Sequence, residues 1–380
     1  MTFESESRQR ARRRRASGAL VDFDGKRLSV ARRLRRMQRA ALAAQTSVTA
    51  AAITQYERGG RPTNTVAAEL ALALGMPIEF FRQGRPLTTI STGEAHFRSL
   101  RATPAISRDQ ALAFAEIALA VIEVILLAAM RARGAQVTDI IEPVDDDPSP
   151  TMIASIAANT RSRLGVEPGP VPHVTRLLEA HGIITLRLPP EIDPRVDAFS
   201  TEAGHRPLVL LSPLKDDRAR SRFDAAHELG HLVMHQDVEP GSKIIETHAH
   251  QFAAEFLAPT SELESDLPRK VDWDALLQAK TKWGISLAAL IYRCHAIGLW
   301  GEHSYRRANQ HLRSQGYPEP GPLGPPESPY LLGAAVDLLN NQESQPVTWQ
   351  VKQIDDVISA SSETKCQAPG FCGGWFIWCW

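Results

Sequence analysis

The sequence predicts a multidomain fold in which an all-α domain is followed by an α+β domain with a small antiparallel or mixed sheet. Its 380 residues, 43% of them hydrophobic, exceed what one ordinary core accommodates. Five short helical patterns follow one another near the N-terminus, whereas three strand-like runs occur among helical patterns farther along the chain. A stretch rich in Pro and Asp at 145–150 is typical of a boundary between domains.

The N-terminal part of the chain is predicted to be a disordered basic arm followed by a small helical domain. Residues 1–25 are rich in Arg and Ser, with scattered apolar side chains. In the domain at 26–84, apolar residues at helical spacing predict helices at 28–37, 40–45, 50–56, 65–74 and 77–81. The third of these helices is ended by Gly59, Gly60 and Pro62.

Residues 85–149 are predicted to form a linker and a connecting helix. The helix runs from about Ser107 to Arg133 and carries Glu116 and Glu123 on one face. Two carboxylates are costly in hydrocarbon, so this pattern favours a buried amphipathic helix over a membrane span.

The second predicted domain covers residues 150–310, and residues 311–380 form a C-terminal extension. Helices are expected near 152–164, 172–181, 221–235, 245–257 and within 272–310, and strands at 183–188, 196–200 and 208–211. In the extension, a Pro/Gly-rich loop at 315–329 precedes one helix within 330–360 and a short strand at 347–351. The Cys- and Trp-rich tail, 364–380, either packs back on the domain or forms a docking patch.

Charge is distributed unevenly along the chain. Lys plus Arg and Asp plus Glu both number 43, but residues 1–62 carry fifteen basic and five acidic side chains, or +10, which leaves −10 for the rest. The N-terminal part of the chain, called the head below, is therefore basic and the remainder is acidic. This asymmetry indicates a polyanionic partner for the head. Four cysteines, three of them in the last fifteen residues, form no disulfide framework across the chain, and the N-terminus has no secretory pattern. We therefore expect a cytoplasmic protein without a membrane partner.

A metal-binding pattern, His-Glu-Leu-Gly-His, occupies residues 227–231 within a predicted amphipathic helix. Residues at i and i+4 share a helix face, so His227 and His231 can reach one Zn2+ ion. Glu228 then lies beside the metal-bound water, where a carboxylate acts as general base. Gly230 is expected to leave room near the metal. The pattern predicts a zinc site with peptide hydrolysis as its reaction.

A catalytic zinc site needs a third protein ligand and an open fourth position. The sequence lacks the Gly and His that a metzincin places after its second motif histidine, because Met234 and Asp237 stand there. The next predicted helix offers four candidates, and spacing alone does not choose among them. These candidates are Glu246, His248, His250 and Glu255.

The two segments together resemble the ImmA/IrrE family of metallopeptidases. That family follows HExxH with ExxAnxFA and an apolar pair before Pro, which is similar to residues 246–259 here, and the resemblance extends from about Phe97 to Leu299. It implies a gluzincin-like metallopeptidase domain with Glu246 as the third zinc ligand. His250 stands where the family usually has Asn, so it is either a neighbour of the ligands or an alternative ligand.

A second motif lies in the helical head. Residues 49–59 read TAAAITQYERG, with Leu42 and Ala43 upstream, and resemble the Cro/repressor-type (XRE) helix-turn-helix over about residues 27–82. The resemblance implies binding to double-stranded DNA, with Val48, Ile53 and Tyr56 in the core.

The positions expected to face base edges are set by the same motif. They are Ala50, Ala51, Thr54 and Gln55, together with Arg39 at the start of the second helix. Alanine reads little beyond thymine methyl groups, so Gln55 and Arg39 are expected to do most of the reading.

These features lead to one functional expectation and two alternatives. The expectation is a DNA-binding regulator that cleaves a protein, either a helix-turn-helix repressor or itself; the fold of the head also serves as a dimerisation module, so a homodimer is considered. One alternative is a DNA-binding regulator whose metal site senses or stabilises without hydrolysis. The other is an antitoxin-like binding module that acts by stoichiometric complex formation.

Overall fold

The computed structural model describes residues 20, 22–84, 87–97, 103–133, 148–193, 195–201, 207–212, 217–235 and 242–340. The chain divides into two compact units. Of the described residues, the first unit contains 20, 22–84, 87–90, 104–133 and 334–340, and the second contains 91–97, 103, 148–193, 195–201, 207–212, 217–235 and 242–333.

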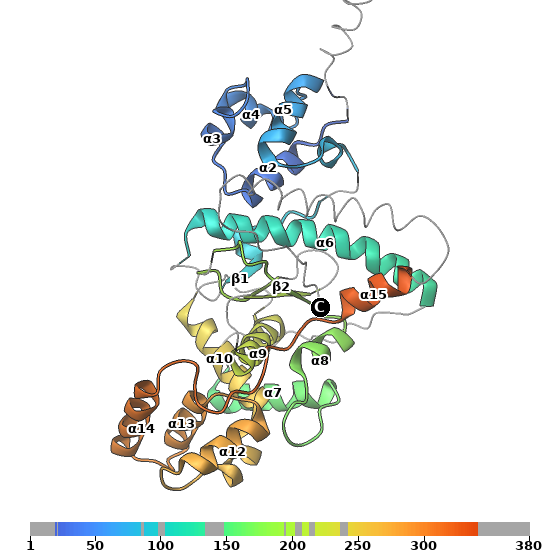
Figure 1. The fold of residues 1–380 in the computed structure, drawn as a ribbon. Helices are drawn as coiled ribbons and strands as arrows, with labels where there is room; N and C mark the ends of the chain where they lie inside the picture. The colour runs from blue at the N-terminus through green and yellow to red at the C-terminus, as the bar shows by residue number, and fades with distance from the viewer. Residues whose placement is uncertain are drawn as a thin grey trace, which may run out of the picture. The chain divides into compact units, whose positions relative to one another are not determined.

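Short helices build the N-terminal part of the first unit (Figure 1). They are α2 (Gly25–Leu34), α3 (Arg39–Ala43), α4 (Ala50–Glu57), α5 (Asn64–Leu74) and the 3-10 helix η1 (Ile78–Phe81). Side-chain caps start three of them, because Asp24, Thr49 and Thr63 accept hydrogen bonds from the first backbone N–H groups of α2, α4 and α5. Gly75, in the left-handed conformation, ends α5. The helical fold expected for the head is confirmed, with its fifth helix of the 3-10 type.

One apolar core holds these helices together. Fully buried side chains from every helix meet there, including Leu28, Leu42, Ile53, Leu70, Leu74 and Phe81. The N-terminus of α2 approaches the end of α4 so closely that a Cβ atom at Gly25 would lie 2.0 Å from the carbonyl oxygen of Tyr56. A side chain at this position would force the two helices apart.

The long helix α6 (Ala105–Arg133) belongs to the same unit and packs against α2. Glu116 is fully buried, accepts a hydrogen bond from the backbone N–H of Ile90 at 2.9 Å and pairs with Arg33. Burial raises the pKa of Glu116, and Arg33 opposes that rise. Among the described helices, none has both the length and the apolar character that crossing a bilayer requires.

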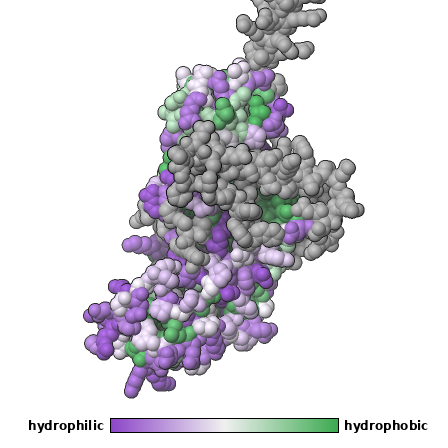
Figure 2. Space-filling view, viewed as in Figure 1, coloured by the Kyte–Doolittle hydropathy of each residue, from purple (hydrophilic) through white to green (hydrophobic). Residues whose placement is uncertain are grey.

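The second unit contains a small sheet and most of the remaining helices. Its helices are η2 (Thr92–Glu94), α7 (Pro150–Arg163), α8 (Val174–Ala180), α9 (Arg218–Met234), α10 (Lys243–Leu257), α11 (Thr260–Leu263), η3 (Glu264–Asp266), α12 (Trp273–Trp283), α13 (Leu287–Ala296) and α14 (Glu302–Ser314); α15 (Leu331–Asn340) begins in it. Its strands are β1 (Ala95–Phe97), β2 (Ile184–Arg187), β3 (Phe199–Thr201) and β4 (Leu208–Leu211). On the face drawn in Figure 2, hydrophilic residues predominate over α12, α13 and α14.

The sheet is mixed and has the order β1-β3-β4-β2. Strand β2 is parallel to β4, whereas β3 runs antiparallel to both β4 and β1. Of the two arrangements expected from the sequence, the mixed one is therefore correct. Strand β1 was not anticipated: its residues fall in the predicted linker, and three residues are too few to show a strand periodicity.

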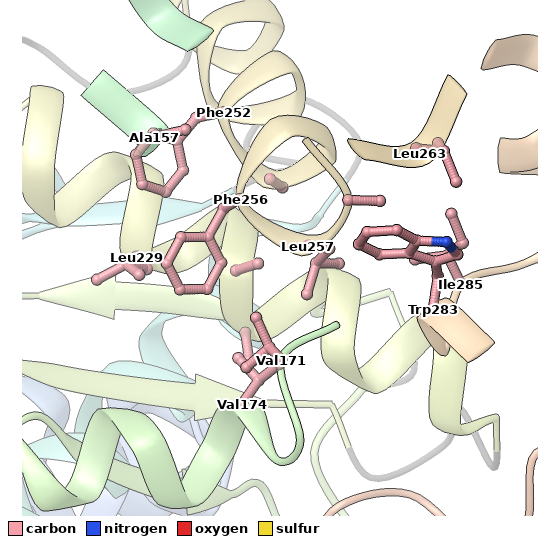
Figure 3. Packing of buried hydrophobic residues seen from close by; sticks show 14 of the residues in the cluster. Ala157, Val171, Val174, Leu229, Phe252, Phe256, Leu257, Leu263, Trp283 and Ile285 are labelled. Atoms are coloured by element: carbon pink, nitrogen blue, oxygen red, sulfur yellow. The ribbon is translucent and has the colours of Figure 1, made fainter. Parts of the chain in front are cut away.

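The core of the second unit lies around α9, α10 and α7, where aromatic and aliphatic side chains interlock (Figure 3). The rings of Phe252 and Phe256 on α10 stack with their centroids 5.8 Å apart. A Cβ atom at Gly230 would lie 2.9 Å from the ring of Phe252. Glycine at this position therefore lets α10 approach α9 closely.

The loop at 315–329 is attached to the second unit by the half-buried Glu319 and the buried Glu327. Glu319 accepts hydrogen bonds from the backbone N–H of Leu287 at 2.8 Å and the ammonium group of Lys280 at 3.2 Å. Glu327, 2% exposed, pairs with Arg222. The strand expected at 347–351, the tail at 364–380 and most of the arm at 1–25 lie outside the described residues.

Candidate metal centre

Two histidines of helix α9 meet one turn apart in the interior of the second unit. Asp217 caps the helix by accepting the N–H groups of Ala219 and Arg220. His227 and His231 are completely buried, and their Nε2 atoms lie 3.1 Å apart. Both imidazoles therefore turn the same ring nitrogen toward one point.

Helix α10 supplies a carboxylate to the same point. Glu246 lies in the first turn of α10, after the cap Ser242, and its side chain is 18% exposed. Its Oε2 is 3.4 Å from Nε2 of His227, and its Oε1 is 3.5 Å from Nε2 of His231. Ligand atoms of the three residues all lie within 4.8 Å of one another. The arrangement is that of a candidate three-residue metal site to which two adjacent helices contribute.

The state of the Glu246 carboxylate tests whether a cation fits this group. Both of its oxygens are shielded from solvent, and neither accepts a hydrogen bond from the part of the chain that the structure describes. A buried carboxylate is unfavourable unless a positive charge, from a bound cation or from a neighbouring side chain, compensates it. Burial raises the pKa of Glu246, but the imidazoles of His227 and His231 outweigh it and lower the pKa to about 2. The carboxylate is thus ionised at neutral pH, and two imidazoles with one carboxylate form a ligand set typical of catalytic zinc.

Glu228 is oriented by the sheet. Its side chain is completely buried, and Oε2 accepts a hydrogen bond from Oγ of Ser200 at 2.7 Å. Ser200 is the middle residue of β3 and is also completely buried. No role for Ser200 was expected from the sequence, because a serine in a short strand carries no signal for a contact 28 positions away.

The other three candidates for the third ligand have different contacts. Nδ1 of His250 lies 2.6 Å from the backbone oxygen of Glu246, and its ring centroid lies 4.6 Å from that of His227. His248 stacks on His235 with the ring centroids 5.9 Å apart. Glu255 pairs with Arg293 at 2.7 Å. Within the described ranges, the metal-type cluster contains Glu246 and none of these three.

Two residues near the metal group have contacts that were not expected from the sequence. His235, directly after α9, places its Nδ1 3.1 Å from Nδ1 of His231. A signal for it existed, because His235 follows His231 at the same four-residue spacing that joins the two motif histidines. Gly230 faces Phe252 rather than the metal group, so the expectation that it leaves room for the metal is corrected.

The residues expected to contact DNA lie on α3 and α4. Ala51 and Gln55 are exposed, whereas Ala50 and Thr54 are half-buried. Ile53 is completely buried, and Val48 and Tyr56 pack against the same core.

Arg39 begins α3 and is tied to the end of α4. Its side chain is 47% exposed, and its guanidinium group pairs with Oε2 of Glu57 at 2.6 Å. The other oxygen of Glu57 accepts a hydrogen bond from Arg32 at 2.6 Å. Glu57 thus fixes the direction in which Arg39 leaves the helix.

Two segments of the chain match known protein families. Residues 178–295 match the M78 peptidase family, described as an IrrE N-terminal-like domain, and this range contains the metal group. Residues 29–81 match a helix-turn-helix family, and this range contains α3 and α4. A search of curated proteins finds no match.

Proposed function

Because the chain combines a helix-turn-helix DNA-binding domain with an M78 peptidase-family domain, we propose that it is a DNA-binding transcriptional regulator with zinc-dependent endopeptidase activity. The observation that carries this proposal is the convergence of His227, His231 and Glu246, with the carboxylate of Glu228 on the same helix. A site that only stabilised the fold would have no need of this second carboxylate, which is not a ligand.

The residues of the site divide the work of peptide hydrolysis. His227, His231 and Glu246 would hold the ion, and a bound Zn2+ would polarise the scissile carbonyl and lower the pKa of its water to about 7. Glu228 accepts the proton of the attacking water and delivers it to the leaving amine. Ser200 holds Oε2 of Glu228 during this transfer, so the base keeps one orientation.

The substrate that we propose is a protein with a repressor-type helix-turn-helix domain, or the chain itself. A head that binds double-stranded DNA would bring the peptidase to the places where such repressors bind. Intramolecular cleavage of the chain and cleavage of a second protein differ in kinetics, because only the intramolecular reaction has a half-life that is independent of protein concentration.

The DNA-binding half of the proposal assigns base contacts to exposed and half-buried side chains of α3 and α4. Arg39, Ala50, Ala51, Thr54 and Gln55 are the residues involved, with Arg39 and Gln55 as the principal readers. The balance of +10 over residues 1–62 supports an affinity that falls steeply with salt. Fluorescence anisotropy with duplexes at several salt concentrations tests this, and an affinity independent of salt would contradict it.

A cleavage assay tests the catalytic half. The zinc-loaded chain is incubated with helix-turn-helix repressors, alongside Glu228→Gln, which keeps the size of the side chain but removes the base. We expect wild-type cleavage that a chelator abolishes and that Zn2+ restores, and no cleavage by the variant. Cleavage that persists in Glu228→Gln would overturn the assignment of the base. Zn2+ bound without cleavage of any repressor or of the chain itself would favour a sensing or stabilising metal site.

A further inference from the structure

We infer that His235 is a positioning residue for the metal site, which it serves by accepting a hydrogen bond from the ring of His231. The inference rests on the proposed metal group, but it does not depend on hydrolysis. The ring of His231 contacts another histidine on each of its two nitrogen atoms. Nε2 of His231 lies 3.1 Å from Nε2 of His227, and Nδ1 of His231 lies 3.1 Å from Nδ1 of His235.

These two distances determine where the protons lie when a metal is bound. A metal on Nε2 of His231 requires the neutral ring to carry its proton on Nδ1. That proton points at Nδ1 of His235, which must then be unprotonated and accept it. His235 therefore carries its own proton on Nε2. The histidine takes the place that a carboxylate or a carbonyl oxygen usually has beside a metal-binding imidazole.

The surroundings of His235 hold its ring in this position. The residue is 3% exposed, and its backbone N–H donates to the carbonyl oxygen of His231 at 2.9 Å. Its ring lies nearly parallel to that of His248 on α10, at an interplanar angle of 20°. The ring is thus fixed between α9 and α10, the two helices that supply the metal ligands.

A purely packing role for His235 makes a different prediction from a hydrogen-bonding role. Packing needs a side chain of suitable volume, whereas orientation of His231 needs an acceptor atom at the position of Nδ1. Asparagine offers an oxygen at nearly that position, and leucine offers a methyl group. The pair His235→Asn and His235→Leu therefore separates the two roles.

The first test measures the affinity of the full chain for Zn2+ by competition with a chromophoric chelator. Loss of a hydrogen-bond partner of a metal-binding histidine lowers the affinity for the metal about 10- to 100-fold. This is the effect that we expect of His235→Leu. We expect His235→Asn to recover most of that affinity. The control is His181→Leu, a histidine of the same unit whose Nδ1 contacts the carbonyl oxygen of Leu177 at 2.8 Å, and we expect no change there. An unchanged affinity in His235→Leu, or equal losses in both His235 variants, would overturn the inference.

The second test needs no substitution. In the zinc-loaded wild-type chain labelled with 15N-histidine, long-range proton–nitrogen spectra report which ring nitrogen carries each proton. We expect the proton of His231 on Nδ1 and that of His235 on Nε2, and a proton on Nδ1 of His235 would refute the inference. A chain that binds Zn2+ with these tautomers but cleaves nothing would refute the proposed activity alone. A wild-type chain that binds no Zn2+ would refute both.

Discussion

The hydroxyl group of Ser200 donates a 2.7 Å hydrogen bond to Oε2 of Glu228, and both side chains are completely buried. The bond joins strand β3 to helix α9. It also lies at the carboxylate to which we assign the proton transfer. The sheet therefore contributes to the proposed chemistry through a residue that binds no metal.

Replacement of Ser200 by Ala is expected to slow peptide cleavage. A hydrogen bond to a charged group contributes about 1.5–3 kcal/mol, so its loss corresponds to roughly a 10- to 100-fold decrease in kcat if the bond is fully used in the transition state. KM should change little, because Ser200 contacts the base rather than the substrate. Steady-state kinetics on a cleaved repressor measures both constants.

Two further variants make this test specific. Ser200→Thr keeps the hydroxyl group and should retain most of the activity. Ser212→Ala removes another buried serine of the same sheet region and should leave kcat unchanged. A Ser200→Ala variant with wild-type kcat would show that Glu228 needs no partner from β3.

Gly230→Ala should weaken both the packing of α9 on α10 and the binding of metal. The added Cβ atom would lie 2.9 Å from the ring of Phe252, and overpacking of this kind destabilises by about 1–3 kcal/mol. Phe252 and Glu246 share helix α10, so displacement of the ring also displaces the carboxylate.

Urea unfolding followed by tryptophan fluorescence, to which the buried Trp283 and Trp300 contribute, measures the first effect, and chelator competition measures the second. In the double variant Gly230→Ala/Phe252→Leu, the smaller side chain makes room for the methyl group. Its destabilisation should therefore be less than the sum of those of the single variants. Strict additivity would show that the contact is not the cause.

The sequence predicted those parts of the fold and site that depend on local periodicity. The helices of the head and the two-histidine face of α9 follow from spacing along a single helix, and the structure has both. Strand β1 and the role of Ser200 depend on pairing between distant segments, which no local pattern encodes. The spacing of residues along one helix could not choose among the four candidates for the third ligand, because that choice also depends on contacts between distant segments. Which turn of α10 faces α9 is decided by contacts such as that of Gly230 with Phe252.

In the head, Glu57→Ala and Arg39→Ala should have different effects on stability. Glu57 pairs with Arg32, whose side chain is 10% exposed, and with Arg39, whose side chain is 47% exposed. Removal of Glu57 leaves the Arg32 charge buried, and breaking a buried pair costs about 3–5 kcal/mol. Removal of Arg39 breaks a half-exposed pair worth less than about 1 kcal/mol.

Hydrogen–deuterium exchange of α2–α5 measures this local stability. Glu57→Ala should accelerate exchange throughout these helices, whereas Arg39→Ala should lower DNA affinity with little change in exchange. Equal exchange in both variants would contradict the special role of the Arg32–Glu57 pair.

The low pKa of Glu246 predicts how the metal-free chain responds to acid. The pKa is lowered from 4.5 to about 2 in the folded state, so the ionised carboxylate stabilises the fold at pH values above 4.5. This contribution is lost as the pH falls from about 4.5 through about 2, because the folded chain then gains the proton that the unfolded chain already holds. Glu246→Gln has no such group. The difference in Tm between wild type and Glu246→Gln, measured in the presence of a chelator, should therefore shrink as the pH falls from about 4.5 toward 2. A difference that grew in acid would mean that the imidazoles of His227 and His231 do not stabilise the Glu246 carboxylate.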